Sequence, residues 1–162
     1  MAAKYTLGID PGMKGGWAVT EKGTGLFAGG GRMPTKAYGK RRQVDVIEWH
    51  RQLQALAGEV TTCCIEMVWS SPQMGVASAF SFGLAQGAAL AFAQGYGLEP
   101  TLVTPQMWKG WYVLRKDKQA SLDLCEEMWP EHEKIWSVKA NDGIAEAALI
   151  ARWLDSRKTN EI

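Results

Sequence analysis

Apolar residues in the first third of the chain fall into short runs separated by turn-forming residues. The run at 4–10 ends at Pro11, and the runs at 15–22 and 25–33 are separated by glycines. Runs of this length bounded by glycine or proline are typical of β-strands. The pattern therefore predicts three antiparallel strands joined as a meander.

Helical periodicity and further apolar runs alternate along the rest of the sequence. The predicted helices are 44–57, 75–96, 116–129 and 140–155, and the predicted strands are 60–68 and 100–104. The segment 32–42 is predicted to be an exposed loop. The order predicts an α/β fold, in which a mixed five-stranded sheet combines the meander with parallel strands and is flanked by helices. No linker divides the chain, so residues 1–162 are predicted to form a single domain.

The 162 residues are long enough to bury a core, and a hydrophobic content of 46% argues against disorder. A formal net charge of +1 excludes a strongly basic nucleic-acid binder and leaves only local basic patches. Cys63, Cys64 and Cys125 form no C-x-x-C pair and are odd in number, which argues against disulfides and zinc. The N-terminus lacks the pattern of a secretory signal, so we predict a reducing, intracellular location.

Residues 67–98 contain no charged side chain but several serines, glutamines and glycines. This composition favours a buried helix over a membrane span. Small residues recur every four positions in the predicted helix 75–96. This small-residue stripe comprises Gly75, Ala79, Gly83, Gly87, Ala91 and Gly95. It allows close approach of another backbone, either within the chain, which the sequence favours, or across a homodimer interface.

Two carboxylates lie at or near the ends of predicted strands. Asp10 ends the first strand, where a turn with Pro11 would explain it structurally. Glu66 lies in the most apolar strand, with no lysine or arginine close by in sequence. A buried acid needs a partner, and a divalent cation shared with other carboxylates would supply one. An exposed strand end or a distant lysine would also explain Glu66.

A second pair of acids, Asp142 and Glu146, lies four residues apart on one face of the last predicted helix. Favourable interaction with the helix dipole would explain the pair on its own. Taken together with Asp10 and Glu66, however, it offers a set of oxygen ligands suited to Mg²⁺ or Mn²⁺ and unsuited to zinc. Two such ions, about 4 Å apart, are a recurrent arrangement in phosphodiester cleavage.

The motifs that carry these acids resemble the RuvC family of Holliday-junction resolvases, which have the RNase H-like fold. GIDPGMKGGWAV, CIEMVW and NDGIAEAALIAR occur in the family's order over residues 4–155, and the variant is more similar to compact phage or viral members. The resemblance implies a homodimeric endodeoxyribonuclease that makes paired symmetric nicks in four-way DNA junctions and leaves 5′-phosphates. It also implies two Mg²⁺ or Mn²⁺ ions per site, and cytoplasmic action in a bacterial or phage-infected cell.

The resemblance assigns roles residue by residue. Asp10 and Glu66 match metal ligands, and Asp142 and Glu146 match the acidic pair of the last helix. The family usually ends with two aspartates three apart, so which member of this pair is the principal ligand stays open. Lys118 matches a basic residue near the scissile phosphate.

Further residues are candidates for contact with DNA. Trp69 matches an aromatic side chain on a loop that enters the junction, where stacking on a base competes with core packing as its explanation. Lys109 is a second candidate near the scissile phosphate. Two basic segments would contact phosphates through Arg32, Lys36, Lys40, Arg41 and Arg42, and through Lys109, Arg115, Lys116 and Lys118.

Three alternatives differ in substrate or in class. The chain could be an RNase H-like nuclease for other branched or hybrid nucleic acids, or a non-catalytic junction-binding protein. A nucleotide-binding actin-like domain is disfavoured by length, because that fold needs two such halves. The tryptophans of segment 105–138 have no explanation in the sequence beyond packing.

Overall fold

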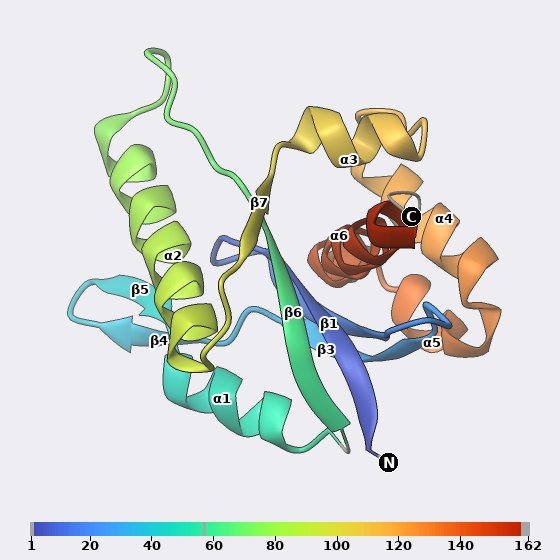
Figure 1. Cartoon of the computed structure of the whole chain (residues 1–162). Coiled ribbons are helices and arrows are strands. Elements are labelled where there is room, and N and C mark those ends of the chain that lie inside the picture. The colour runs from blue at the N-terminus through green and yellow to red at the C-terminus, as the bar shows by residue number, and fades with distance from the viewer. Residues whose placement is uncertain (1, 57, 160–162) are drawn as a thin grey trace.

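A five-stranded mixed sheet forms the centre of this computed structural model, which describes residues 2–56 and 58–159 (Figure 1). The strands are β1 (Ala3–Asp10), β2 (Gly16–Glu21), β3 (Phe27–Arg32), β6 (Gly58–Glu66) and β7 (Thr101–Val103). Their spatial order is β3-β2-β1-β6-β7. The first three pair antiparallel, whereas β6 runs parallel to both β1 and β7. The predicted fold class is confirmed.

Helices cover both faces of the sheet (Figure 1). One face carries α1 (Val46–Gln54) and α2 (Val76–Gly95). The other carries α3 (Pro105–Trp111), α4 (Lys118–Met128), α5 (Glu133–Trp136) and α6 (Asp142–Thr159), with short 3₁₀ turns at Pro130–His132 and Lys139–Asn141. Each face has its own buried cluster, because alternate strand residues point to opposite sides.

Helix α6 lies unusually close to the sheet, because glycines face it. A Cβ atom on Gly8 of β1 would clash with the Ala147 carbonyl oxygen. A Cβ atom on Gly16 of β2 would lie 2.7 Å from the carbonyl carbon of Gly143. These glycines let the backbone of α6 rest directly on β1 and β2.

The prediction that residues 32–42 form a loop is wrong. Most of this segment belongs to an antiparallel hairpin of β4 (Thr35–Tyr38) and β5 (Arg41–Val44), which we call the basic hairpin. Gly39, with φ of 60°, makes the turn. The hairpin is polar on both sides, so no apolar alternation marked it as a pair of strands. The guanidinium of Arg41 lies 5.1 Å from the centre of the Phe80 ring, which joins the hairpin to α2.

Two helices depart from a simple apolar pattern or from the predictions. In α1 the apolar residues Val46 and Ile47 are exposed, whereas Trp49 and Leu53 are buried in the core. Helix α3 was not predicted, although Thr104 before Pro105 is a typical helix start.

The prediction that the helix 75–96 is buried is also wrong. Only Ala85, Ala89, Phe92 and Ala93 of α2 are buried. A Cβ atom on Gly83 or on any other glycine of the small-residue stripe would meet nothing within 4 Å in the described chain. Packing within the chain therefore does not explain the stripe. By length and composition alone α2 could cross a membrane, with 22% of its apolar window buried.

Candidate metal centre

Asp10 and Glu66 lie side by side because their strands are parallel neighbours. Ile9 of β1 is in register with Ile65 of β6, and each acid is the next residue along its strand. Both carboxylates are therefore at the same edge of the sheet. Both side chains are only partly exposed.

Glu146 completes a group of three carboxylates with Asp10 and Glu66, which we call the acidic cluster. One oxygen atom from each lies within 4.8 Å of the other two. Glu146 projects from α6, whose close approach over Gly8 and Gly16 brings it to the strand ends. Oxygen ligands gathered in this way fit Mg²⁺ or Mn²⁺.

Asp142 lies beside the acidic cluster, where one of its carboxylate oxygens is 3.1 Å from the Nζ atom of Lys118. Asp142, Lys118, Asp10 and Glu146 line one wall of a hollow of about 680 Å³, which we call the acidic hollow. The loop 11–15 and the first half of α2 form its other walls. Three of the four predicted acids thus converge at one point, and the fourth is adjacent.

The acidic cluster is electrostatically unfavourable in the absence of a cation. Burial raises the pKa of Asp10 well above its ordinary value, and the negative charges of Glu146, Glu66 and Asp142 raise it further. Burial also raises the pKa of Glu66. Perturbed carboxylates in a hollow are typical of functional sites, because a bound cation would offset their repulsion.

Trp108 holds Glu66 through a contact that the sequence did not indicate. The indole Nε1 of this fully buried tryptophan donates a hydrogen bond of 2.6 Å to Oε2 of Glu66, which opposes the rise in the pKa of Glu66. The sequence feature that could have pointed to this contact is the group of tryptophans after residue 105. Trp129 and Trp136 are buried too, and their indole nitrogens donate to the backbone oxygens of Gly25 and Trp129.

The two lysines predicted near the scissile phosphate both lie at the acids. The Nζ atom of Lys109 is 3.0 Å from Oε1 of Glu146 and 5.1 Å from the centre of the Trp108 ring. Lys118, which contacts Asp142, is largely exposed, and that contact raises its pKa. Lys109 therefore contacts a member of the acidic cluster, whereas Lys118 contacts the neighbouring Asp142.

None of the other predicted DNA-binding residues lines the acidic hollow. Trp69 is 63% exposed, which rules out core packing as its explanation. Arg115 pairs with Asp117 at 3.3 Å, and Lys116 is exposed beside it. On the basic hairpin, Lys36 lies 3.7 Å from Asp45. The remaining members, Lys40, Arg41 and Arg42, are exposed, and Arg32 at the end of β3 donates to Asn141 at 2.8 Å.

Solved structures of similar fold include two of a RuvC protein. The chain "T. thermophilus RuvC in complex with Holliday junction substrate" matches with a TM-score of 0.60 at 16% identity, covering 96% of each chain. A second, "Thermus thermophilus RuvC structure", matches with a TM-score of 0.50 at 15% identity and the same coverage. No family model and no curated protein matches the sequence. The likeness shows that the chain has the RuvC-like, RNase H-like fold.

Proposed function

We propose that this protein is a divalent-metal-dependent endodeoxyribonuclease that resolves four-way DNA junctions by paired symmetric nicks. The observation that carries the proposal is the acidic cluster, in which three carboxylates meet at the strand ends. Lys109 contacts one of them, and Lys118 contacts the neighbouring Asp142. The fold adds support, because a protein of the same fold is in complex with a Holliday junction substrate. The substrate class comes from that likeness together with the sequence motifs.

The residues of the site divide into metal-holding and phosphate-holding groups. Asp10, Glu66 and Glu146 would hold up to two Mg²⁺ or Mn²⁺ ions, which supply a Lewis acid and an activated water for phosphodiester hydrolysis. Lys118 is exposed enough to exchange Asp142 for a phosphate oxygen of the bound strand. Hydrolysis at this site would leave a 5′-phosphate.

The geometry favours Glu146 over Asp142 as the principal ligand from the last helix. Glu146 belongs to the acidic cluster, whereas Asp142 is engaged by Lys118. We therefore assign Asp142 to positioning Lys118 and to completing the ion's surroundings through water.

Cleavage of synthetic substrates tests this proposal directly. A labelled four-way junction, a flap, an RNA–DNA hybrid and a linear duplex are incubated with Mg²⁺ or Mn²⁺, and the products are mapped to single nucleotides. We expect symmetric nicks in the junction, and their loss in Asp10→Asn and Glu66→Gln with junction binding retained. Full activity in either variant would overturn the assignment. Preferred cleavage of the hybrid or flap would identify a different RNase H-like nuclease, and binding without cleavage would identify a junction-binding protein.

We also propose that the protein acts as a homodimer joined through α2. The small-residue stripe is open and lies near exposed apolar side chains, with Val76 87% and Phe80 52% exposed. Pairing of this face with a second copy would bury it, and a two-fold dimer matches the symmetry of a four-way junction.

Sedimentation velocity over a range of concentrations tests the dimer. Gly87→Glu places a charge in the middle of the stripe, where a Cβ atom would meet nothing within 4 Å among the described residues. We expect this variant to be monomeric, and the control Ser137→Glu, at an exposed site at the end of α5, to remain dimeric. A dimeric Gly87→Glu protein would place the interface elsewhere. Flotation of the wild-type protein with lipid vesicles would instead assign the face of α2 to a membrane. The phage-type relationship and the cytoplasmic location stay predictions.

A further inference from the structure

A second hollow continues from the acidic hollow along α2. It has a volume of about 460 Å³ and lies between the loop 11–15, the basic hairpin and α2. Met13, Lys14, Ala77 and Ser81 line both hollows, so the two are contiguous. We call this second space the basic hollow.

The walls of the basic hollow carry only positive charge. Lys14 comes from the loop, and Arg41 and Arg42 come from the hairpin; none of the described residues that line it is acidic. Neither arginine forms a salt bridge with any carboxylate in the described chain. The acidic hollow, which would hold cations, therefore opens into the basic hollow, whose charge suits anions.

Both guanidinium groups are fixed by neutral contacts. Arg42 donates from Nε to Oγ1 of Thr35 at 3.1 Å, and from Nη2 to the backbone oxygen of Thr35 at 2.8 Å. None of the described hydrogen bonds uses its Nη1 atom. Arg41 stacks over Phe80. These contacts hold the two side chains in place and leave their charges unpaired. Such arginines lose less conformational entropy on binding a phosphate than mobile arginines do.

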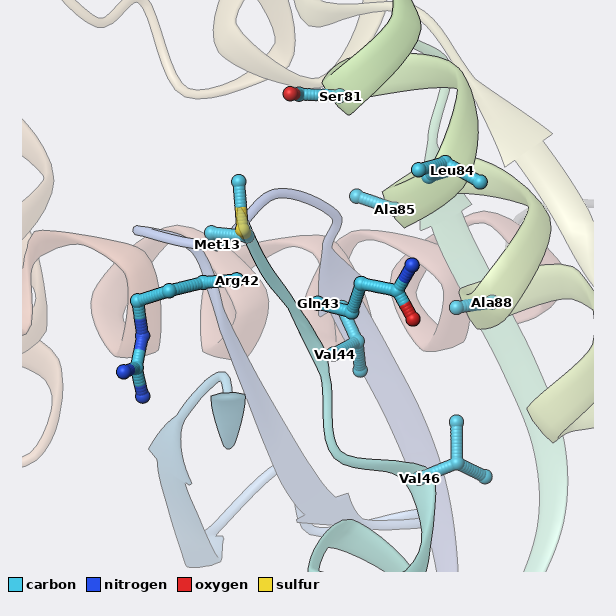
Figure 2. A pocket seen from close by; sticks show the side chains of 9 residues that line it. All are labelled: Met13, Arg42, Gln43, Val44, Val46, Ser81, Leu84, Ala85 and Ala88. Atoms are coloured by element: carbon cyan, nitrogen blue, oxygen red, sulfur yellow. The ribbon is translucent and has the colours of Figure 1, made fainter. Parts of the chain in front are cut away.

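The wall of α2 allows a chain to pass between the two hollows. Figure 2 shows a neighbouring part of the space, where Met13 lies between Arg42 of β5 and the α2 side chains Ser81 and Ala85. The two α2 residues that line both hollows, Ala77 and Ser81, have small side chains. The surface thus offers a path with carboxylates at one end and free cations at the other.

We propose that the basic hollow is a backbone-phosphate subsite that holds the cleaved DNA strand a few nucleotides from the scissile bond. The inference rests on the proposed nuclease function and adds to it a direction for the strand, from the acidic cluster past Lys14 toward Arg41 and Arg42. The ligand is the phosphodiester backbone itself, so the subsite carries no base preference.

The salt dependence of binding tests the charge of the subsite. Anisotropy of a labelled four-way junction is measured in EDTA for the wild type and for Arg41→Gln/Arg42→Gln. Loss of two phosphate contacts reduces the slope of log K against log salt by about 1.4–1.8. Arg41→Lys/Arg42→Lys keeps the charge and should keep the slope. The control Lys4→Gln/Lys134→Gln removes two exposed charges from the far end of β1 and from α5 and should keep it as well.

Crosslinking tests the path of the strand. Ser81→Cys places a thiol between the two hollows, while the three native cysteines are buried. The junction carries thiol-reactive groups on single phosphates. We expect crosslinks within a few nucleotides of the nick and on the nicked strand, with none from the control Ser137→Cys.

The outcomes separate the two proposals. An unchanged salt slope in Arg41→Gln/Arg42→Gln, with a circular dichroism spectrum like that of the wild type, overturns the subsite. Crosslinks on another arm of the junction also overturn it. Neither result affects the nuclease proposal, which depends on the loss of cleavage in Asp10→Asn. Conversely, a reduced slope together with full cleavage by Asp10→Asn would support the subsite and refute the proposed active site.

Discussion

Replacement of Asp10 by asparagine should stabilise the metal-free protein while removing its function. Burial and the charges of three neighbouring acids raise the pKa of Asp10 well above its ordinary value. Asparagine has nearly the same shape but no charge. The substitution therefore removes a repulsion without leaving a cavity, whereas most substitutions destabilise a protein.

The size of the effect follows from the geometry. Two unit charges separated by about 5 Å interact with about 3 kcal/mol at an effective dielectric constant near 20. The carboxylate oxygens of the cluster lie within 4.8 Å of one another. The positive charge of Lys109 partly offsets the repulsion at Asp10. We therefore expect Asp10→Asn to stabilise the metal-free fold by about 1–3 kcal/mol, or roughly 2–12 °C in Tm.

Thermal unfolding in EDTA and in Mn²⁺ is the assay. A metal at 100 times its Kd stabilises a protein by about 2.7 kcal/mol. The wild type should gain this stabilisation, whereas Asp10→Asn should start higher and gain little. The control is Asp155→Asn, because Asp155 accepts hydrogen bonds from Thr6 at 2.6 Å and from Thr20 at 3.5 Å and lies outside the cluster. That variant also replaces a carboxylate by an amide and should keep the full response to metal.

Two results would refute this reasoning. If Asp10→Asn unfolds at a lower temperature than the wild type in EDTA, the carboxylate is stabilised by contacts rather than strained by repulsion. If Mn²⁺ raises the Tm of both proteins equally, the ion binds elsewhere.

Three further predictions concern the same site. Trp108→Phe keeps a buried ring but removes the donor to Glu66, so it should cost about 1.5–3 kcal/mol in denaturant unfolding and weaken stabilisation by Mn²⁺; an unchanged response to Mn²⁺ would count against this hydrogen bond as a support of the ligand. The pKa values of Asp10 and Glu66 are raised in the folded state, so the folded protein binds more protons than the unfolded chain above their ordinary values. Titration of these two carboxyl groups should therefore lower the free energy of unfolding in EDTA as the pH rises from about 4 toward neutrality. The decrease should be smaller in Asp10→Asn. Glu146→Gln should abolish the shift in Tm caused by Mn²⁺, whereas Asp142→Asn should only reduce it, and the opposite ranking would make Asp142 the principal ligand.

The sequence was sufficient for the strand framework, because its strands are bounded by glycine and proline. Asp10 and Glu66 could be linked before the structure was known, since each lies at or near the end of an apolar strand. The convergence of Glu146 with them depends on how closely α6 approaches the sheet, which periodicity does not reveal. The choice between Asp142 and Glu146 was therefore open until the two side chains could be placed.

Other features depend on contacts between distant segments. The basic hairpin has no apolar alternation, so its strands were predicted to be a loop. The outward orientation of the small-residue stripe depends on which face of α2 meets the sheet, and the composition favoured burial. The bond from Trp108 to Glu66 joins α3 to β6, and no spacing rule connects these two positions.

The glycine contacts beneath α6 have a consequence for how such a site can change over time. Because Gly8 and Gly16 meet the helix backbone directly, main-chain atoms rather than core side chains fix the separation between Glu146 and Asp10. Substitutions in the hydrophobic clusters can alter volume and stability while this separation is preserved. Substitutions in the core should thus leave the distances between the carboxylates unchanged. Gly8 and Gly16, which allow the close backbone contact, are the positions that tolerate substitution least.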